Sequence, residues 1–314
     1  MKKIFIFILS VIIILSAFTS CTAPDETSDN GKINVVTTIF PVYDWTKNVA
    51  GENCNIIYLD ESGTDMHSFE PTAKNILSIT NAYVFIHVGG VSDEWVENAL
   101  NASGNTSLIT LTLADITGMI EEEIIDGMEH NHESDHDFLQ NDEHIWLSLK
   151  KAQTAVSAIA ETLAKADSSN ADEYKSNAAS YNKKLSSLDK KYADCVNNAK
   201  RKTLLFADRF PFRYLTEDYG LEYFAAFPGC SAEAEASFET MTFLIEKTRE
   251  LSLPCIITIE NSDSKIADTI SNETDTKILS LNSCQSVTKA DIDNGITYIS
   301  AMESNLQIIT EALN

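Results

Sequence analysis

The sequence predicts an α/β protein made of two parallel-sheet halves that are joined by one long helix. Three observations support this prediction. Short apolar runs alternate with segments of helical period in residues 33–113, and the alternation resumes in residues 201–314. The segment between them, from 149 to 198, has helical period and contains neither proline nor glycine. Strands that alternate with helices pair in parallel, as βαβ units.

Four strands are predicted in the first half, from short apolar runs that are rich in β-branched or aromatic residues. They lie at residues 33–39, 55–59, 83–88 and 107–113. The gaps between them have helical period, so we expect one helix that ends at Ala50 and two more at 72–80 and 92–100. Ser92 is expected to cap the third helix, because a serine oxygen accepts from the free backbone N–H groups of a first turn.

Residues 114–143 interrupt this alternation. They are acidic and polar and contain several histidines, so they are predicted to form a long loop. Two helices then follow, at 149–166 and 170–198, with a polar joint between them that also caps the second helix. The second helix is long for one packed inside a single domain and suits a connecting strut.

The second half repeats the pattern of the first. Strands are expected at residues 203–207, 222–227, 255–260 and 277–281, and a last helix at 297–313. No strand is followed by a Gly-x-Gly-x-x-Gly or phosphate-binding loop, which argues against a nucleotide-binding fold. The expected organisation is therefore an N-terminal lobe at 33–148, a helical segment at 149–200 and a C-terminal lobe at 201–314.

The charge of the chain excludes one class of partner. Its 314 residues include 23 basic and 47 acidic side chains, for a formal net charge of −24. A protein that binds nucleic acid needs a basic face to neutralise phosphates, so no nucleic-acid partner is expected. The hydrophobic share of 44% and the charged share of 22% are ordinary for a globular protein, which argues against wholesale disorder.

The first residues indicate export and anchoring. Residues 1–20 have two lysines and then an apolar run that is too short to span a membrane, as expected of a signal peptide. Small residues before Cys21 resemble a lipoprotein processing site, and residues 21–32 are polar enough to serve as a tether. We expect Cys21 to be lipidated and the mature chain to be held at the extracytoplasmic face of the cell membrane. The alternative is plain secretion, with Cys21 as an ordinary thiol.

The other five cysteines do not form a recognisable motif. No two of them have Cys-x-x-Cys spacing, which argues against a structural zinc knuckle or a thioredoxin-like site. Their odd number leaves at least one thiol unpaired. An exported protein can form disulfides, and one bridge among Cys230, Cys255 and Cys284 is a hypothesis.

Histidines are the candidate functional residues. His87 lies inside an apolar predicted strand and is expected to be a hydrogen-bonded core residue. His67 follows the carboxyl end of a predicted strand, where open parallel sheets bind their ligands. His144 lies between a loop and a helix, away from any predicted core face.

The residues around these two histidines resemble a known family. The string GTDMHSFEPT around His67 and the string DEHIWLS around His144 are similar to the two metal-ligand motifs of solute-binding proteins that serve ABC transporters for zinc and manganese. The Glu94-Trp95 pair, the string YGL at 219–221 and the end of the chain from Tyr298 are also similar to that family. The likeness covers essentially the whole mature chain.

The resemblance implies a metal site in a cleft between two α/β lobes that are joined by a rigid helix. It assigns His67 and His144 as two ligands from the N-terminal lobe. The third ligand position of the family falls on Arg209, which stays protonated and has no lone pair to donate. Asp208 would then take its place as an oxygen ligand. Glu260 matches an acidic residue of the family and is expected either to bind the metal or to pair with Arg209.

A second cluster of histidines precedes His144. His130, His132 and His136 alternate with carboxylates, a composition that suits weak accessory capture of a cation such as zinc. Zinc-uptake members of the family often carry such a loop at this place. Because imidazole suits zinc and carboxylate-rich sites suit manganese, the histidines favour Zn²⁺ over Mn²⁺.

The sequence therefore predicts a monomeric metal receptor that delivers a divalent cation to the membrane subunits of an ABC permease. Alternatives are a manganese-specific receptor of the same family and a surface adhesion lipoprotein. A zinc-dependent hydrolase is less favoured, since no predicted helix carries a His-Glu-x-x-His motif and no serine has the glycine flanks of a nucleophile elbow. We expect no enzymatic activity.

Overall fold

The computed structural model describes residues 31–129, 140–231 and 235–314. The chain divides into Met1–Lys32 and a unit from Ile33 to Asn314, and the fold below is that of the second unit. The signal peptide, Cys21 and the histidines at 130, 132 and 136 lie outside the described residues. No described helix is both long enough and apolar enough to cross a membrane.

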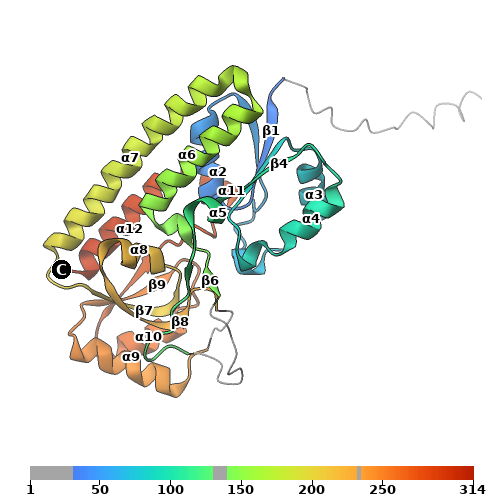
Figure 1. The fold of residues 1–314 in the computed structure, drawn as a ribbon. Coiled ribbons are helices and arrows are strands. Elements are labelled where there is room, and N and C mark those ends of the chain that lie inside the picture. Colours follow the sequence, from blue (N-terminus) through green and yellow to red (C-terminus); the bar gives the residue numbers. More distant parts are fainter. Residues whose placement is uncertain (1–30, 130–139, 232–234) are drawn as a thin grey trace, which may run out of the picture. The chain divides into compact units, whose positions relative to one another are not determined.

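A four-stranded parallel sheet forms the centre of the N-terminal lobe (Figure 1). Its order is β2-β1-β3-β4, with bounds Cys54–Tyr58, Ile33–Thr37, Val84–His87 and Ile109–Thr112 respectively. Val35 and Val36 of β1 are fully buried on opposite faces, because helices cover both sides of the sheet. The helices of this lobe are α2 (Phe40–Ala50), η1 (Met66–Ser68), α3 (Ala73–Thr80), η2 (Val91–Asp93), α4 (Trp95–Ser103) and α5 (Leu113–Thr117).

A second parallel sheet lies in the C-terminal lobe, with the order β10-β9-β7-β8. Its strands are β7 (Thr203–Phe210), β8 (Glu222–Pro228), β9 (Cys255–Ile259) and β10 (Lys277–Leu281). All five residues of β9 are buried, as expected of an inner strand. The helices are α8 (Arg213–Tyr219), α9 (Phe238–Glu250), α10 (Lys265–Thr274), α11 (Lys289–Asp293) and α12 (Tyr298–Ala312).

The two long helices predicted between the lobes are present, as α6 (Leu149–Ala166) and α7 (Ala171–Asn198), with η4 (Ser168–Asn170) at the joint. The buried residues of α7 recur at intervals of three or four, which places them on one face. They are Tyr174, Ala178, Tyr181, Leu185, Leu188, Tyr192 and Val196. Figure 1 shows this helix running beside both lobes, and its hydrogen bonds tie it to each.

Hydrogen bonds from two buried tyrosines connect α7 to both lobes. The hydroxyl of Tyr181 donates to Asp44 Oδ2 of α2 at 2.7 Å, and the hydroxyl of Tyr192 donates to the Met302 carbonyl of α12 at 2.6 Å. The predicted fold class, with two parallel-sheet lobes joined by a long helix, is therefore confirmed.

Three local predictions are wrong. The polar joint does not cap α7, because Asn170 makes no side-chain hydrogen bond to the first turn of that helix. Part of the segment predicted as one loop is ordered, since it contains α5 and a short antiparallel pair of strands, β5 (Ile120–Glu121) and β6 (Asn141–Asp142). Ser92 does not cap α4: that helix begins after Glu94, and Ser92 lies in η2 with its hydroxyl turned towards Glu143 and His67. Ser92 bonds instead to the carboxylate of Glu143, which lies shortly before η3 (Ile145–Leu147).

Candidate metal centre

His67 lies in η1, the short turn that follows β2. Asp65 precedes the turn and accepts the backbone N–H of His67 through Oδ1, at 3.0 Å. The ring Nδ1 lies 2.9 Å from Ser92 Oγ and 3.2 Å from Glu143 Oε1. Because the carboxylate is an acceptor, Nδ1 carries the proton and Nε2 keeps a lone pair. Nε2 is buried and has no hydrogen-bond partner.

Glu143 is held where it can orient His67. Its side chain is fully buried, and its carboxylate accepts the Ser92 backbone N–H at 2.9 Å as well as the Ser92 hydroxyl. Gly90 allows this approach, because it has a φ of 101° and an added Cβ would lie 2.5 Å from Glu143 Oε2. Burial alone would raise the pKa of Glu143, but His67, His144 and Ser92 together hold it below its usual value.

His144 follows β6 and is completely buried. Asp142 Oδ1 accepts both its backbone N–H, at 2.8 Å, and its ring Nδ1–H, at 2.9 Å. This pairing leaves Nε2 buried without a hydrogen-bond partner, as in His67. A carboxylate on one ring nitrogen, with the other nitrogen left to bind a cation once it is deprotonated, is the arrangement of metal-binding histidines.

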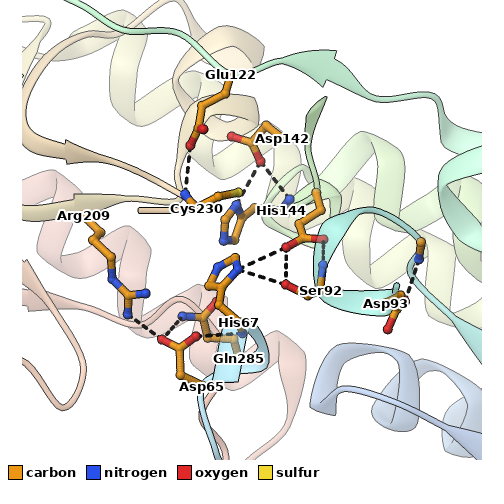
Figure 2. Close-up of polar contacts among 12 residues, drawn as sticks. Asp65, His67, Ser92, Asp93, Glu122, Asp142, His144, Arg209, Cys230 and Gln285 are labelled. Carbon is orange, nitrogen blue, oxygen red and sulfur yellow. Dashed lines mark hydrogen bonds and ion pairs between the residues drawn. The ribbon is translucent and has the colours of Figure 1, made fainter. Parts of the chain in front are cut away.

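Figure 2 shows the two histidine rings facing each other, with Cys230 beside His144. The ring centroids lie 5.4 Å apart. One candidate ligand atom from each of His67, His144 and Cys230 lies within 4.8 Å of the other two, and among the described residues this is the only group of three metal-ligating side chains that meets this spacing. Cys230 comes from the C-terminal lobe, so the group joins both lobes.

Cys230 lies in the loop after β8. Its backbone N–H donates to Glu122 Oε1 at 2.8 Å. The preceding Gly229 permits a close approach, since an added Cβ would lie 2.8 Å from the Phe210 carbonyl oxygen and 3.3 Å from His144 Cε1. Among the described residues, no disulfide joins Cys230 to Cys255 or Cys284.

The metal-free group holds protons that a cation would have to displace. Burial lowers the pKa of His144, but the charge and hydrogen bond of Asp142, together with the contact to Cys230, outweigh that effect and raise the pKa well above its ordinary value. Burial also raises the pKa of the Cys230 thiol, although His144 partly offsets it. A cation that binds here takes the place of these protons.

The two predicted carboxylate ligands are not part of this group. Asp208 accepts the Arg209 backbone N–H at 2.8 Å and the Ile259 backbone N–H at 3.3 Å. Both oxygens of Glu260 are taken by Ser283, through its backbone N–H at 2.7 Å and its hydroxyl at 2.5 Å. Burial raises the pKa of Glu260.

Arg209 does not pair with Glu260. Its Nη2 donates to Asp65 Oδ2 at 2.5 Å, and the same oxygen accepts from Gln285 Nε2 at 3.2 Å. The positive charge is therefore neutralised by another acid, on the turn that carries His67. These residues line a cavity of about 520 Å³ that also reaches His67, Asp208 and Glu260.

His87 is a hydrogen-bonded core residue, as its position in an apolar strand predicts. Its Nδ1 lies 3.0 Å from Asp93 Oδ2 and its Nε2 lies 3.0 Å from Thr112 Oγ1, so both ring nitrogens have protein partners. This arrangement separates His87 from the two histidines whose Nε2 atoms have none.

The sequence analysis missed Cys230 as a member of the group. A usable signal was present, because Cys230 follows a predicted strand by three residues and the carboxyl ends of parallel strands are where such sheets bind ligands. Without a second motif residue nearby, the cysteine looked like an ordinary thiol.

The comparison with known proteins is consistent with the candidate metal site described above. Residues 35–312 match the family model described as "Zinc-uptake complex component A periplasmic". The chain is 33% identical over 315 residues to the zinc-binding lipoprotein AdcA of Streptococcus pneumoniae strain R6, covering 99% of this chain and 61% of AdcA. It thus spans about three-fifths of the length of that relative.

One further protein, and one domain of AdcA, match over nearly their whole length. The high-affinity zinc uptake system protein ZnuA of Bacillus subtilis is 29% identical, with 99% of this chain and 97% of ZnuA covered. The crystal structure of the Zn(II)-bound ZnuA-like domain of S. pneumoniae AdcA has 33% identity and a TM-score of 0.73, and the match covers 90% of this chain and 99% of that domain.

Proposed function

The chain belongs to the family of periplasmic zinc-uptake complex A components, which are binding components rather than enzymes, and we propose that it captures zinc outside the cytoplasm and delivers it to an ABC permease. The observation that carries this proposal is the pair of buried, unpartnered Nε2 atoms of His67 and His144. Leaving two polar atoms buried without partners costs free energy unless a ligand satisfies them. A divalent cation between the two rings does so.

His67 and His144 are assigned as ligands through Nε2 of the neutral imidazoles. Zinc accepts histidine nitrogen readily, whereas carboxylate and water oxygens suit manganese better. Asp142 and Glu143 act through the histidines, since each accepts from a ring Nδ1–H and so orients the ring. The imidazole pair therefore supports zinc rather than manganese as the cargo.

The proposed location follows from the first residues of the chain. The relative AdcA is named a lipoprotein, and Cys21 here follows a signal-like segment. We therefore assign lipidation to Cys21 and place the receptor, as a monomer, at the outer surface of the cell membrane. Its partners are the membrane subunits of the permease.

Residues His130, His132 and His136 are proposed to capture zinc weakly and pass it to the buried site. The described residues that flank their segment are anchored by hydrogen bonds. Glu129 accepts the backbone N–H of Ser237 at 2.7 Å, and the Gln140 carbonyl accepts from the Glu122 N–H at 2.8 Å. Deletion of residues 130–138 should remove weak additional zinc binding and keep one tight site, as measured by calorimetry. Loss of the tight site would contradict an accessory role.

Metal analysis of the purified protein tests the main proposal. We expect one tightly bound zinc per chain, retained when manganese is offered in competition. The double variant His67→Ala/His144→Ala should lose it, while His87→Gln should keep it, because both ring nitrogens of His87 already have protein partners. Preference for manganese would instead favour a manganese receptor. Absence of tight binding of either metal would refute a metal receptor and leave the adhesion lipoprotein.

A further inference from the structure

The position where a third ligand is expected carries Arg209, whose guanidinium is already paired with Asp65. Asp208 and Glu260 lie outside the group of converging ligand atoms, and their oxygens accept from backbone N–H groups or from Ser283. Among the described residues, the side chain of the C-terminal lobe that joins this group is Cys230.

On the basis of the proposed zinc-binding function, we propose that Cys230 is the C-terminal lobe's ligand, so that this receptor holds its cation with two imidazoles and one thiolate. The thiol comes within 4.8 Å of the candidate ligand atoms of His67 and His144. Both histidines have buried Nε2 atoms without a hydrogen-bond partner, so three donors converge on one place.

The surroundings of Cys230 hold it in position for this role. The Cys230 N–H is bound to Glu122, and Gly229 allows the loop to pass close to the His144 ring. Cys255 and Cys284 are buried elsewhere in the C-terminal lobe and are also free, so no disulfide partner competes for the Cys230 sulfur.

Binding then has a defined proton balance. The thiol gives up its proton to solvent, and its sulfur donates an electron pair to the cation. Zinc prefers four ligands and binds thiolate well, whereas manganese prefers oxygen. A thiolate therefore makes the site selective for zinc and similar soft or borderline cations, and leaves one coordination position for water or another small donor.

Cobalt(II) substitution tests the assignment directly. A thiolate bound to Co(II) adds a sulfur-to-metal charge-transfer band in the near ultraviolet, which imidazole and oxygen ligands do not produce. We expect the band in the wild-type protein and in Cys195→Ser, the matched control, whose thiol lies on α7 beside Thr310. Cys230→Ser should lack it.

Zinc affinity provides a second test of the Cys230 ligand. Loss of a direct ligand should cost at least as much as loss of a residue that only orients one, so Cys230→Ser should bind zinc roughly 10- to 100-fold more weakly or worse. Manganese affinity should change less, so the preference for zinc should fall. Equal zinc affinity in Cys230→Ser and wild type would overturn the proposal.

Thiol alkylation provides a test that needs no variant. Bound zinc should slow the reaction of Cys230 with iodoacetamide and leave Cys195 unaffected, as read by peptide mass spectrometry. A zinc-loaded protein in which Cys230 reacts as fast as in the metal-free protein would refute the thiolate ligand. If the wild type binds zinc tightly but its Co(II) form lacks the charge-transfer band, Cys230 is not a ligand and the receptor function stands. If the wild type does not bind zinc tightly, the receptor function itself is refuted.

Discussion

At the scale of single residues, the centre depends on carboxylates that are not ligands themselves. Asp142 accepts from His144 twice, and Glu143 with Ser92 surrounds Nδ1 of His67. Each acceptor keeps the proton on Nδ1 and directs Nε2 at the shared space. Asp142 and Glu143, the two residues before His144, are therefore as important for the geometry of the site as the histidines themselves.

Replacing Asp142 should weaken zinc binding without removing a ligand. An amide at this position is a poorer acceptor and no longer stabilises the ring orientation, so Asp142→Asn should lower zinc affinity by roughly 10- to 100-fold. Competition with a coloured chelator measures this. Asp208→Asn is the matched control, because Asp208 contacts backbone N–H groups rather than the histidines. If Asp208→Asn shows the larger loss, Asp208 belongs in the coordination sphere.

The pH dependence of zinc affinity should extend beyond that of an ordinary histidine site. The cation needs deprotonated ligands, and the pKa values of His144 and Cys230 are both raised in the metal-free protein. Affinity should therefore fall at low pH and keep rising as pH increases above about 6.5, the reference pKa of histidine. Calorimetry in buffers of different ionisation enthalpy should show proton release at neutral pH. An affinity that stays flat from about pH 6 to about pH 8, on both sides of the histidine reference value, would mean that oxygen ligands dominate.

The same shift has a consequence for the stability of the metal-free protein. A histidine with a raised folded pKa stabilises the fold below its unfolded pKa, and that contribution is lost as pH rises through the folded pKa. The ion pair of His144 with Asp142 thus stabilises the empty protein most under acidic conditions, where zinc binds least.

At the scale of elements, α7 supports the site by connecting the lobes that supply its ligands. Its buried stripe packs against the core, and its tyrosines bond to α2 on one side and α12 on the other. A helix of this length with one apolar face derives its stability from packing rather than from propensity.

Tyr181→Phe should destabilise the protein and leave zinc affinity unchanged. The substitution removes the hydroxyl that bonds to buried Asp44 and leaves the longer contact from Asn48 Nδ2, at 3.3 Å, on the same oxygen; a lost hydrogen bond to a charged group costs about 1.5–3 kcal/mol. Urea unfolding of the metal-free protein measures the change. Tyr83→Phe, at an exposed position, should have little effect. An unchanged midpoint in Tyr181→Phe would show that this link between α7 and α2 is not important for stability.

At the scale of the whole molecule, the two lobes meet at a second polar contact beside the metal centre. Arg209 and Gln285 of the C-terminal lobe both donate to Asp65, which also orders the turn of His67. Hydrogen bonds from Arg209 and Gln285 stabilise the Asp65 carboxylate beside the site. The charge of Arg209 and its hydrogen bond help to keep the pKa of Asp65 below its usual value, against the effect of burial.

Arg209→Ala should loosen this contact. The pair is partly exposed, so its loss should cost about 1 kcal/mol or less in urea unfolding, and less at high salt. Zinc affinity should change by far less than in Cys230→Ser, because Arg209 supplies no ligand. Lys74→Ala, which removes an exposed ion pair with Glu61, is the control and should have no measurable effect. A loss of zinc binding in Arg209→Ala would place the arginine in ligand recognition.

Local sequence determined most of the fold. The strands appear within a few residues of their apolar runs, and α6 spans the predicted residues, because burial of β-branched runs and helical periodicity are properties of short segments. His67 and His144 are identifiable for the same reason, since each lies in a short motif. The motif of His144 also contains its orienting carboxylate, Asp142, whereas the ring of His67 is oriented by Glu143 of the other motif.

Only the tertiary structure decided which groups meet. Cys230 joins His144 from 86 positions further along the chain, where no local pattern marks it, and Arg209 finds Asp65 rather than Glu260 across 144 positions. Ser92, expected to cap a helix, bonds instead to Glu143, which is 51 positions further along the chain. Such contacts depend on how loops at the ends of separate strands are packed together, and the physical cause is long-range packing, which short-range periodicity does not encode.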